Sequence, residues 1–237
     1  MEVRFAVAKI SKYATRESGD TVEMIERPHG GLSLVMVDGQ RSGRSAKKIS
    51  NLVARKAIQL LSEGVRDGAA ARAAHDYLFT QRAGKVTATL NIISVDAVTQ
   101  TVVISRNNPA SVLVHTPQRG LFCLDEPSES IGTRRNTKPI ISEIPTELGP
   151  LIVAYTDGLR HAGGWHSHQQ LDPLLATQSL LAGGISEPRE IADQLLALAV
   201  EMDDGRPRDD ISVLVISVKE RLPGQDEVRR LSGRFPL

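Results

Sequence analysis

The stretch LSLVMVDGQRSGRSAKKISNLVARKAIQLL, residues 32–61, combines a strand-like run, an acidic pair and a helical pattern. Its first seven residues are mostly apolar and end at Asp38, which is followed by Gly39. From residue 45 to residue 61, apolar residues recur at steps of three and four with basic residues between them, which predicts an amphipathic helix. A strand that runs straight into an aspartate places a partly desolvated carboxylate at the strand end.

Two other segments repeat this combination of an apolar run and an aspartate. LIVAYTD, residues 151–157, ends in Asp157-Gly158, and Asp209-Asp210 precedes ISVLVISV, residues 211–218. Carboxylates that gather at strand ends repel one another, so a cation is needed to offset the repulsion. Any single Asp-Gly pair can also be an ordinary turn, in which Gly supplies a positive φ. The joint pattern favours metal binding.

Composition limits the partners of this 237-residue chain. With a net charge of +1 and 3% aromatic residues, it offers neither a basic surface nor base-stacking platforms for nucleic acid. Cys123 is the only cysteine, which excludes an internal disulfide and a thiolate zinc site. MEVRFAVAKI at the N-terminus lacks a signal-peptide core, and apolar stretches such as residues 195–200 are too short to span a bilayer. We expect a cytoplasmic protein that binds neither nucleic acid nor membrane.

The hydrophobic pattern predicts an α+β fold of two antiparallel sheets flanked by helices. A hairpin is expected at Gly30-Gly31, and the short spacing of the middle strands favours antiparallel meander pairing. Gly84 is expected to cap the second helix. We expect one domain over residues 1–220 and a C-terminal tail over 221–237, either a short helix or disordered. The predicted strands are 2–10, 21–27, 32–38, 86–96, 99–105, 111–115, 120–124, 151–157 and 211–218, and the predicted helices are 45–61, 67–82, 171–182 and 188–202.

Six segments carry a family resemblance: Ser18-Gly19-Asp20, VMVDGQRSGRSA (35–46), ISRNNPASVLV (104–114), Ile131-Gly132, LIVAYTDGLRHA (151–162) and RDDISVLVISV (208–218). Through them the chain resembles the PPM-type (protein phosphatase 2C-like) serine/threonine phosphatases. Within that group it is similar to the bacterial branch typified by the stage II sporulation protein E and the sigma-B regulator phosphatases. The resemblance covers about residues 3–219 and implies a four-layer αββα sandwich.

The resemblance also implies a catalytic centre with two divalent metal ions, Mn²⁺ or Mg²⁺. Asp38 would bridge both ions and Gly39 would contribute its carbonyl. Asp157 and Asp209 would hold one ion, and Asp20 would support the other, directly or through water. A metal-bridging water would attack phosphoserine or phosphothreonine on a regulatory protein, with a STAS-type sigma-factor or stressosome regulator as the expected substrate. In this assignment Asp38, Asp157 and Asp209 are the catalytic residues.

The loop after the first aspartate departs from the family pattern. It reads Arg41-Ser42-Gly43 where the branch usually has Gly-His-Gly, so no histidine near Asp38 in the sequence can serve as general acid. The leaving alkoxide must then be protonated by metal-bound water or by another group. His161 replaces the usual acidic residue after the TDG motif. Arg41 and Arg44 are candidates for phosphate binding, although exposed arginines are more often solvated surface charges.

Other polar residues favour structural roles. Trp165, His166 and His168 are expected to be surface residues, because two histidines without a third ligand make no metal clamp. Asn107 and Asn108 are expected to cap a turn rather than to bind substrate. The pair Asp203 and Asp204 is expected to be a solvated loop, with contact to a third, weaker metal as the alternative.

Two other function classes share features with this sequence. A haloacid-dehalogenase-type phosphohydrolase needs an Asp-x-Asp nucleophile motif, which Val37-Asp38-Gly39-Gln40 does not supply. A phosphatase fold that serves as a phosphoprotein-binding or scaffold module with impaired catalysis remains open, because the loop after Asp38 is altered.

Overall fold

The computed structural model describes residues 1–164, 169–221 and 228–236. Its strands form two five-stranded sheets in which all neighbouring pairs are antiparallel. The first sheet contains, in spatial order, β1 (Glu2–Ile10), β10 (Ile211–Lys219), β9 (Leu151–Tyr155), β6 (Val112–Thr116) and β7 (Gly120–Leu124). The second contains β2 (Thr21–Glu26), β3 (Gly31–Gly39), β4 (Ala88–Asp96), β5 (Thr101–Asn107) and β8 (Ile140–Pro145).

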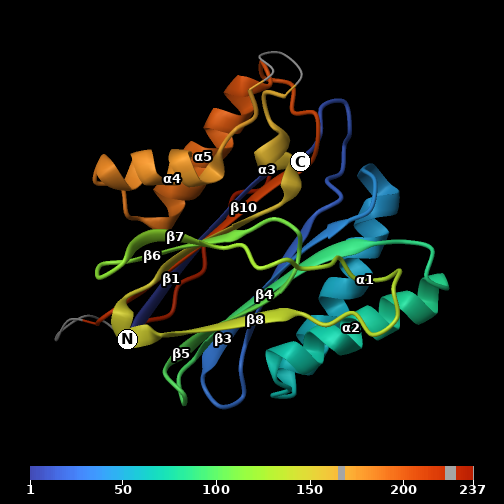
Figure 1. The fold of residues 1–237 in the computed structure, drawn as a ribbon, viewed down its shortest axis with the longest axis horizontal. Helices are drawn as coiled ribbons and strands as arrows, with labels where there is room; N and C mark the ends of the chain where they lie inside the picture. The colour runs from blue at the N-terminus through green and yellow to red at the C-terminus, as the bar shows by residue number, and fades with distance from the viewer. Residues whose placement is uncertain (165–168, 222–227, 237) are drawn as a thin grey trace.

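The sheets pack face to face, and helices cover both outer faces, so the molecule has four layers (Figure 1). Helices α1 (Gly43–Ser62) and α2 (Asp67–Arg82) pack on the second sheet. Helices α4 (Pro173–Ala182) and α5 (Pro188–Met202) cover the first sheet, and the short α3 (Asp157–His161) packs beside α5. A 3₁₀ turn spans Thr146–Leu148. The predicted αββα sandwich is confirmed.

Strand β3 shows how one segment serves two apolar layers. Because side chains alternate along a strand, Val35 and Val37 pack against the helices while Leu34 and Met36 pack between the sheets. Asp38 continues the face of Leu34 and Met36 and therefore points toward the other sheet. This alternation carries the first candidate ligand to the edge of the inter-sheet layer.

The middle of the chain pairs differently from a continuous meander. Strands β4 and β5 pair with each other, and so do β6 and β7, but β5 and β6 lie in different sheets. The connection at Asn107 and Asn108 carries the chain from one sheet to the other. The sequence analysis also missed β8, which pairs with β5 as an edge strand, and Gly84 is not the first left-handed residue after α2, because Ala83 already has φ 50°.

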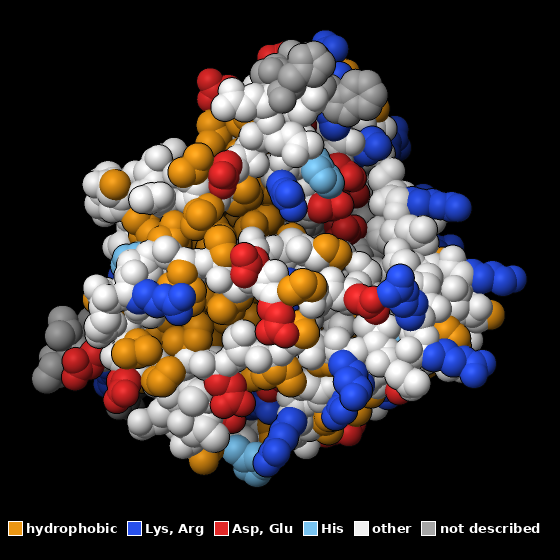
Figure 2. All heavy atoms as spheres, in the orientation of Figure 1, with side chains coloured by type: hydrophobic (Ala, Val, Ile, Leu, Met, Phe, Trp, Pro, Cys, Tyr) orange, Lys and Arg blue, Asp and Glu red, His pale blue; other side chains and the backbone are white. Residues whose placement is uncertain are grey.

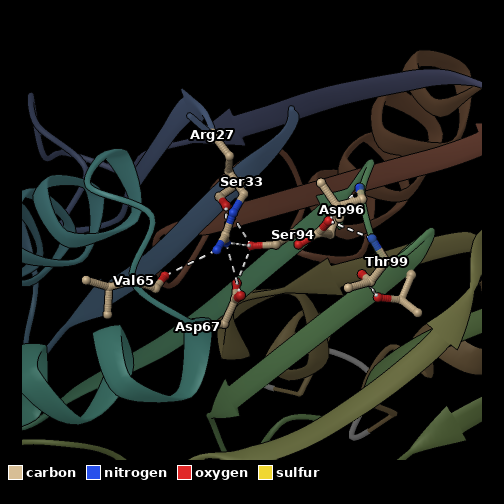
Figure 3. Close-up of polar contacts among 9 residues, drawn as sticks. Arg27, Ser33, Val65, Asp67, Ser94, Asp96 and Thr99 are labelled. Carbon is tan, nitrogen blue, oxygen red and sulfur yellow. Dashed lines mark hydrogen bonds and ion pairs between the residues drawn. The ribbon is translucent and has the colours of Figure 1, made fainter. Parts of the chain in front are cut away.

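A buried ion pair attaches the start of α2 to the second sheet (Figure 3). Arg27 Nη1 lies 3.1 Å from Asp67 Oδ2, and the two side chains are only 9% and 7% exposed. The same guanidinium donates to Ser33 and Ser94 on β3 and β4 and to the Val65 carbonyl. Since a buried charge without a partner is costly, removal of one member would leave the other uncompensated.

Two further features concern the helices and the C-terminal residues. Among the described residues, no helix combines the length and the apolar character needed to cross a membrane. Residues 228–236 contain no helix or strand, and Arg229 pairs with Glu26 at the end of β2.

Candidate metal centre

The first aspartate motif is built around a close approach between β3 and α1. A Cβ atom added at Gly39 would lie 2.2 Å from the Ala46 carbonyl oxygen, so only glycine lets the helix pack this tightly on the strand end. Gly39 has no positive φ, and neither does Gly158, where an added Cβ would lie 2.2 Å from the Asp210 carbonyl oxygen. In both Asp-Gly pairs the glycine therefore provides space rather than a turn conformation, unlike the turn alternative considered from the sequence.

The second motif changes element at the aspartate. Strand β9 ends at Tyr155, Thr156 occupies the N-cap position, and Asp157 begins α3. The Thr156 hydroxyl accepts the Ser212 backbone N–H at 2.9 Å and donates to Asp20 Oδ2 at 3.1 Å. An acidic residue in the first turn of a helix is favoured by the backbone dipoles, although a helix of five residues contributes little.

Asp20 lies at the centre of a buried hydrogen-bond network. It is fully buried, and Ser212 Oγ donates to its Oδ2 at 2.6 Å, in addition to Thr156. Its Oδ1 is buried and has no hydrogen-bond partner. A buried carboxylate oxygen without a partner is costly unless a proton or a cation compensates it.

The third motif divides its two acids between two tasks. Asp210 is buried and accepts the backbone N–H groups of Lys12 at 2.9 Å and Gly19 at 2.8 Å, which ties the β1–β2 loop to the start of β10. Asp209 accepts the Asp210 N–H at 2.9 Å and faces a cavity. This division leaves Asp209 as the member available to a ligand.

The cavity has a volume of about 500 Å³ and lies between the ends of the two sheets. Asp38, Gly39, Asp157 and Asp209 line it. Figure 2 shows a group of acidic side chains recessed on this face of the molecule, with a histidine and a basic side chain next to it. The wall also includes basic and histidine side chains from three segments, namely Lys12, Arg41, and Arg160 with His161.

The electrostatics show that the four carboxylates interact. Burial, together with the charges of Asp20, Asp157 and Asp209, raises the pKa of Asp38 to about 9. Burial also raises the pKa of Asp20 to about 6, against hydrogen bonds from Ser212 and Thr156 that lower it. The pKa of Asp209 is raised as well, mainly by burial. Ionisation of Asp38, Asp20 and Asp209 is therefore disfavoured unless a positive charge compensates it.

A divalent cation fits these residues by its chemistry. The donors are all oxygens, the set that Mg²⁺ and Mn²⁺ prefer, and the orphaned Asp20 Oδ1 lacks only a positive partner. Across the described residues, no three acidic, histidine or cysteine side chains converge closely enough to enclose an ion by themselves. Backbone carbonyls and water would therefore have to complete the coordination, as is common for Mg²⁺.

The sequence-predicted substrate residues differ in position. Arg41 lines the cavity and has φ 76°, whereas Arg44 is exposed on α1 and is not among the lining residues. Sequence reasoning missed Lys12 and Arg160, which do line it. Arg160 follows Asp157 by three residues, so helical spacing within the TDG motif was a signal that could have identified it.

Histidine 161 also reaches the site. Its Nδ1 lies 3.9 Å from Asp157 Oδ2, and it lines the same cavity as Asp38. The loop after Asp38 contains no histidine, and the fold brings His161 to the cavity from α3. The structure therefore places a titratable ring in the cavity wall.

Three predictions about other polar residues have different outcomes. Asp203 was expected in a solvated loop, but it is buried and accepts the N–H groups of Gly163 and Arg208 at 2.9 and 3.0 Å. Asn108 caps the turn as expected, since its Oδ1 accepts the Ala110 N–H at 2.9 Å. Asn107 instead donates to the Glu129 and Lys138 carbonyls.

Trp165, His166 and His168 lie outside the described residues.

Sequence comparison identifies one family. The family model described as Stage II sporulation protein E (SpoIIE) matches residues 28–219, which is most of the chain. No curated protein sequence matches this chain significantly.

Solved structures share the fold at low identity. The PP2C phosphatase domain with a fragment of the regulatory domain of SpoIIE from Bacillus subtilis has a TM-score of 0.75 and 20% identity, over 92% of this chain and 64% of that one. The catalytic domain of the serine/threonine phosphatase PstP with two manganese ions has a TM-score of 0.67 and 18% identity, over 92% and 99%. The structure of the RsbU and RsbW domains of a Mycobacterium tuberculosis protein has a TM-score of 0.73 and 18% sequence identity, and the match covers 93% of this chain and 61% of that one. The chain belongs to the SpoIIE family and has the fold of PP2C-type phosphatase domains.

Proposed function

We propose that this protein is a metal-dependent phosphatase that removes phosphate from phosphoserine or phosphothreonine on a regulatory protein, without a covalent phosphoenzyme. One observation carries the proposal: the carboxylates of Asp38, Asp157 and Asp209, from three remote segments, line one cavity. Burial of Asp38, together with these charges and that of the buried Asp20, raises the pKa of Asp38 to about 9. A cluster with this charge needs cations, and cations at such a cluster are suited to phosphate chemistry.

The ligand roles follow the geometry of the cavity. Asp38 is the proposed bridging ligand, because three carboxylates act on it. Asp157 and Asp209 would hold one ion and the Gly39 carbonyl with Asp20 the other. When bound, two divalent ions would neutralise the phosphate and lower the pKa of a water molecule.

The basic side chains of the cavity wall would bind the phosphate. Arg41 and Arg160 can each present a planar guanidinium to two phosphate oxygens, and Lys12 adds a point charge. Their task is to orient the monoester so that its phosphorus faces the carboxylate cluster, since positioning and electrostatics supply most of the rate in phosphoryl transfer. Arg44 does not line the cavity and would instead contact the phosphoprotein outside it.

A protein of the STAS type that regulates a sigma factor or a stressosome is the proposed substrate. A similar structure contains RsbU and RsbW domains in one chain, which is the setting of partner-switching regulation. To test this identification separately from the chemistry, the purified chain is incubated with a phosphorylated STAS protein. The loss of phosphate from that protein is then measured.

The chemistry is tested by hydrolysis of p-nitrophenyl phosphate with and without Mn²⁺. We expect turnover that requires Mn²⁺ and that falls at least about 100-fold in Asp157→Asn, because a lost ligand removes charge from the transition state. The exposed Asp204→Asn serves as a matched control and should retain activity. Equal activity of Asp157→Asn and the parent would contradict the assignment.

A binding module with impaired catalysis is the second candidate. It is favoured by the altered loop Arg41-Ser42-Gly43 and by the absence, in the described chain, of three side chains that enclose an ion unaided. If the parent hydrolyses neither p-nitrophenyl phosphate nor a phosphoserine protein, but binds that phosphoprotein, this second function replaces the first.

A further inference from the structure

Two lysine ammonium groups converge on one residue of the carboxylate cluster. Lys9 Nζ and Lys47 Nζ each lie 2.6 Å from the backbone carbonyl oxygen of Asp20. Lys47 also donates to Thr21 Oγ1 at 3.0 Å. Both contacts are partly buried, so the two charges are not fully screened by water.

The two lysines reach this point from different parts of the fold. Lys9 lies on β1, on the face that Val3 and Phe5 turn toward the second sheet. Lys47 lies near the start of α1, whose first turn contains no acidic residue. Positive side chains are disfavoured near a helix N-terminus, so helix stability does not account for Lys47.

The ammonium groups repel each other as well as any other cation nearby. Asp20 meanwhile keeps its carboxylate Oδ1 without a hydrogen-bond partner. Two positive charges thus lie at the backbone carbonyl of Asp20, and the buried Oδ1 of its carboxylate lacks a partner.

We propose that Lys9 and Lys47 act as fixed internal counter-charges that weaken divalent-ion binding on the Asp20 side of the cluster. The inference rests on the metal centre of the proposed function and adds an order of loading. The first ion binds at Asp157 and Asp209, and the second, which needs Asp20, binds only at higher metal concentration. The degree of activity would then follow the metal supply.

The size of the effect follows from Coulomb's law. At dielectric values between those of a protein surface and water, the repulsion between an ammonium group and a divalent ion bound at the same residue changes the affinity for the ion about tenfold. Loss of one ammonium should therefore tighten the weaker binding event by about that factor and leave the tighter event nearly unchanged.

The test is calorimetric titration of the full chain with Mn²⁺, which measures binding rather than turnover. Lys9→Met and Lys47→Met are each expected to strengthen the weaker event about tenfold. Lys48→Met, the adjacent exposed lysine of α1, is the matched control and should bind as the parent does. If the parent shows one event only, the Met variants are expected to show a second.

Charge-retaining variants separate electrostatics from geometry. Lys9→Arg and Lys47→Arg keep the positive charge and should reproduce the affinities of the parent. Unchanged or weaker Mn²⁺ binding in both Met variants would overturn the proposal. It would also be overturned if the Arg variants bound Mn²⁺ more tightly than the parent, as the Met variants are expected to do.

The two proposals can fail separately. Mn²⁺-dependent hydrolysis by a parent whose Met variants bind metal unchanged would refute only the loading order. Failure of every variant and of the parent to bind Mn²⁺ would refute both the metal centre and this inference.

Discussion

At the scale of single residues, charge decides what this cavity can do. Asp38 lies where its strand ends, and Asp20, Asp157 and Asp209 all act on it. A carboxylic acid with a raised pKa binds a proton in the folded protein that it releases on unfolding. The free energy of unfolding therefore decreases as pH rises from about 4, the usual value, toward about 9.

Replacement of Asp38 by Asn should stabilise the metal-free protein, because it removes a charge that the folded state disfavours. We expect the melting temperature in EDTA to rise by a few degrees at pH 8, where each kcal/mol corresponds to roughly 2–4 °C in a protein of this size. The gain should shrink toward pH 5, since the protonation of Asp38 on folding costs less free energy as the pH approaches the usual carboxyl pKa of about 4. A lower melting temperature for the variant at pH 8 would show that Asp38 is stabilised by contacts instead.

Arginine 160 provides a second test at this scale. Arg160→Gln should lower kcat/KM for a phosphoprotein about 10- to 100-fold, the range expected for the loss of a charged hydrogen bond. Arg44→Gln, at a position that does not line the cavity, should have a smaller effect. Steady-state kinetics with one phosphoprotein substrate compares the two, and a larger effect at Arg44 would place the phosphate elsewhere.

At the scale of elements, side chains far apart in the sequence fasten loops around the cavity. His75 of α2 is buried, and its Nδ1 accepts the Gly132 N–H at 3.1 Å. This bond supports the segment in which Ile131 pairs with Ala88 and Ser130 lines the cavity. Burial lowers the pKa of His75, against a weak opposing effect of Asp76.

Acid should therefore loosen this segment. A histidine with a lowered pKa contributes stability that is present above about pH 6.5 and is lost as pH falls below it, because the unfolded chain takes up the proton first. His75→Leu should reduce this pH dependence and cost about 1–3 kcal/mol at pH 7.5, since the buried Gly132 N–H loses its acceptor. Chemical denaturation at pH 5.5 and 7.5 measures the loss of stability and its pH dependence. His29→Gln, at an exposed position, is the control. If the free energy of unfolding of His75→Leu changes with pH as much as that of the parent, the pH dependence belongs to other groups.

At the scale of the whole molecule, the proposed metal centre joins the two halves of the sandwich. Asp38 comes from the sheet covered by α1 and α2, whereas Asp157 and Asp209 adjoin strands of the other sheet. Ions held between them would bind the folded state alone, because the unfolded chain does not bring these acids together.

Addition of Mn²⁺ should therefore raise the melting temperature, and EDTA should reverse the rise. At a free concentration 100 times the dissociation constant, the stabilisation is about 2.7 kcal/mol. Asp157→Asn should lose most of it. Thermal melts across a Mn²⁺ series measure the effect, and the same melting temperature at millimolar Mn²⁺ as in EDTA would argue against a metal centre.

Much of the fold could be predicted because apolar periodicity is a local property. The helices at 45–61 and 188–202 and the strands of β1, β3 and β10 agree with the structure within a few residues. Strand β8 was missed because an edge strand of six residues, with alternating partial exposure, has a weak local pattern and gains its definition from β5. Asp203 was misjudged because burial depends on which distant backbone N–H groups reach its carboxylate.

The sequence by itself determined the order of most elements, β8 excepted, and the positions of the acids at element ends, since both depend on neighbouring residues. Only the tertiary structure decided that β5 and β6 belong to different sheets, that Arg160 and His161 line the cavity of Asp38, and that Lys9 and Lys47 meet at Asp20. These facts are long-range contacts, and they arise because each sheet must bury one face against the other sheet and the other face against helices.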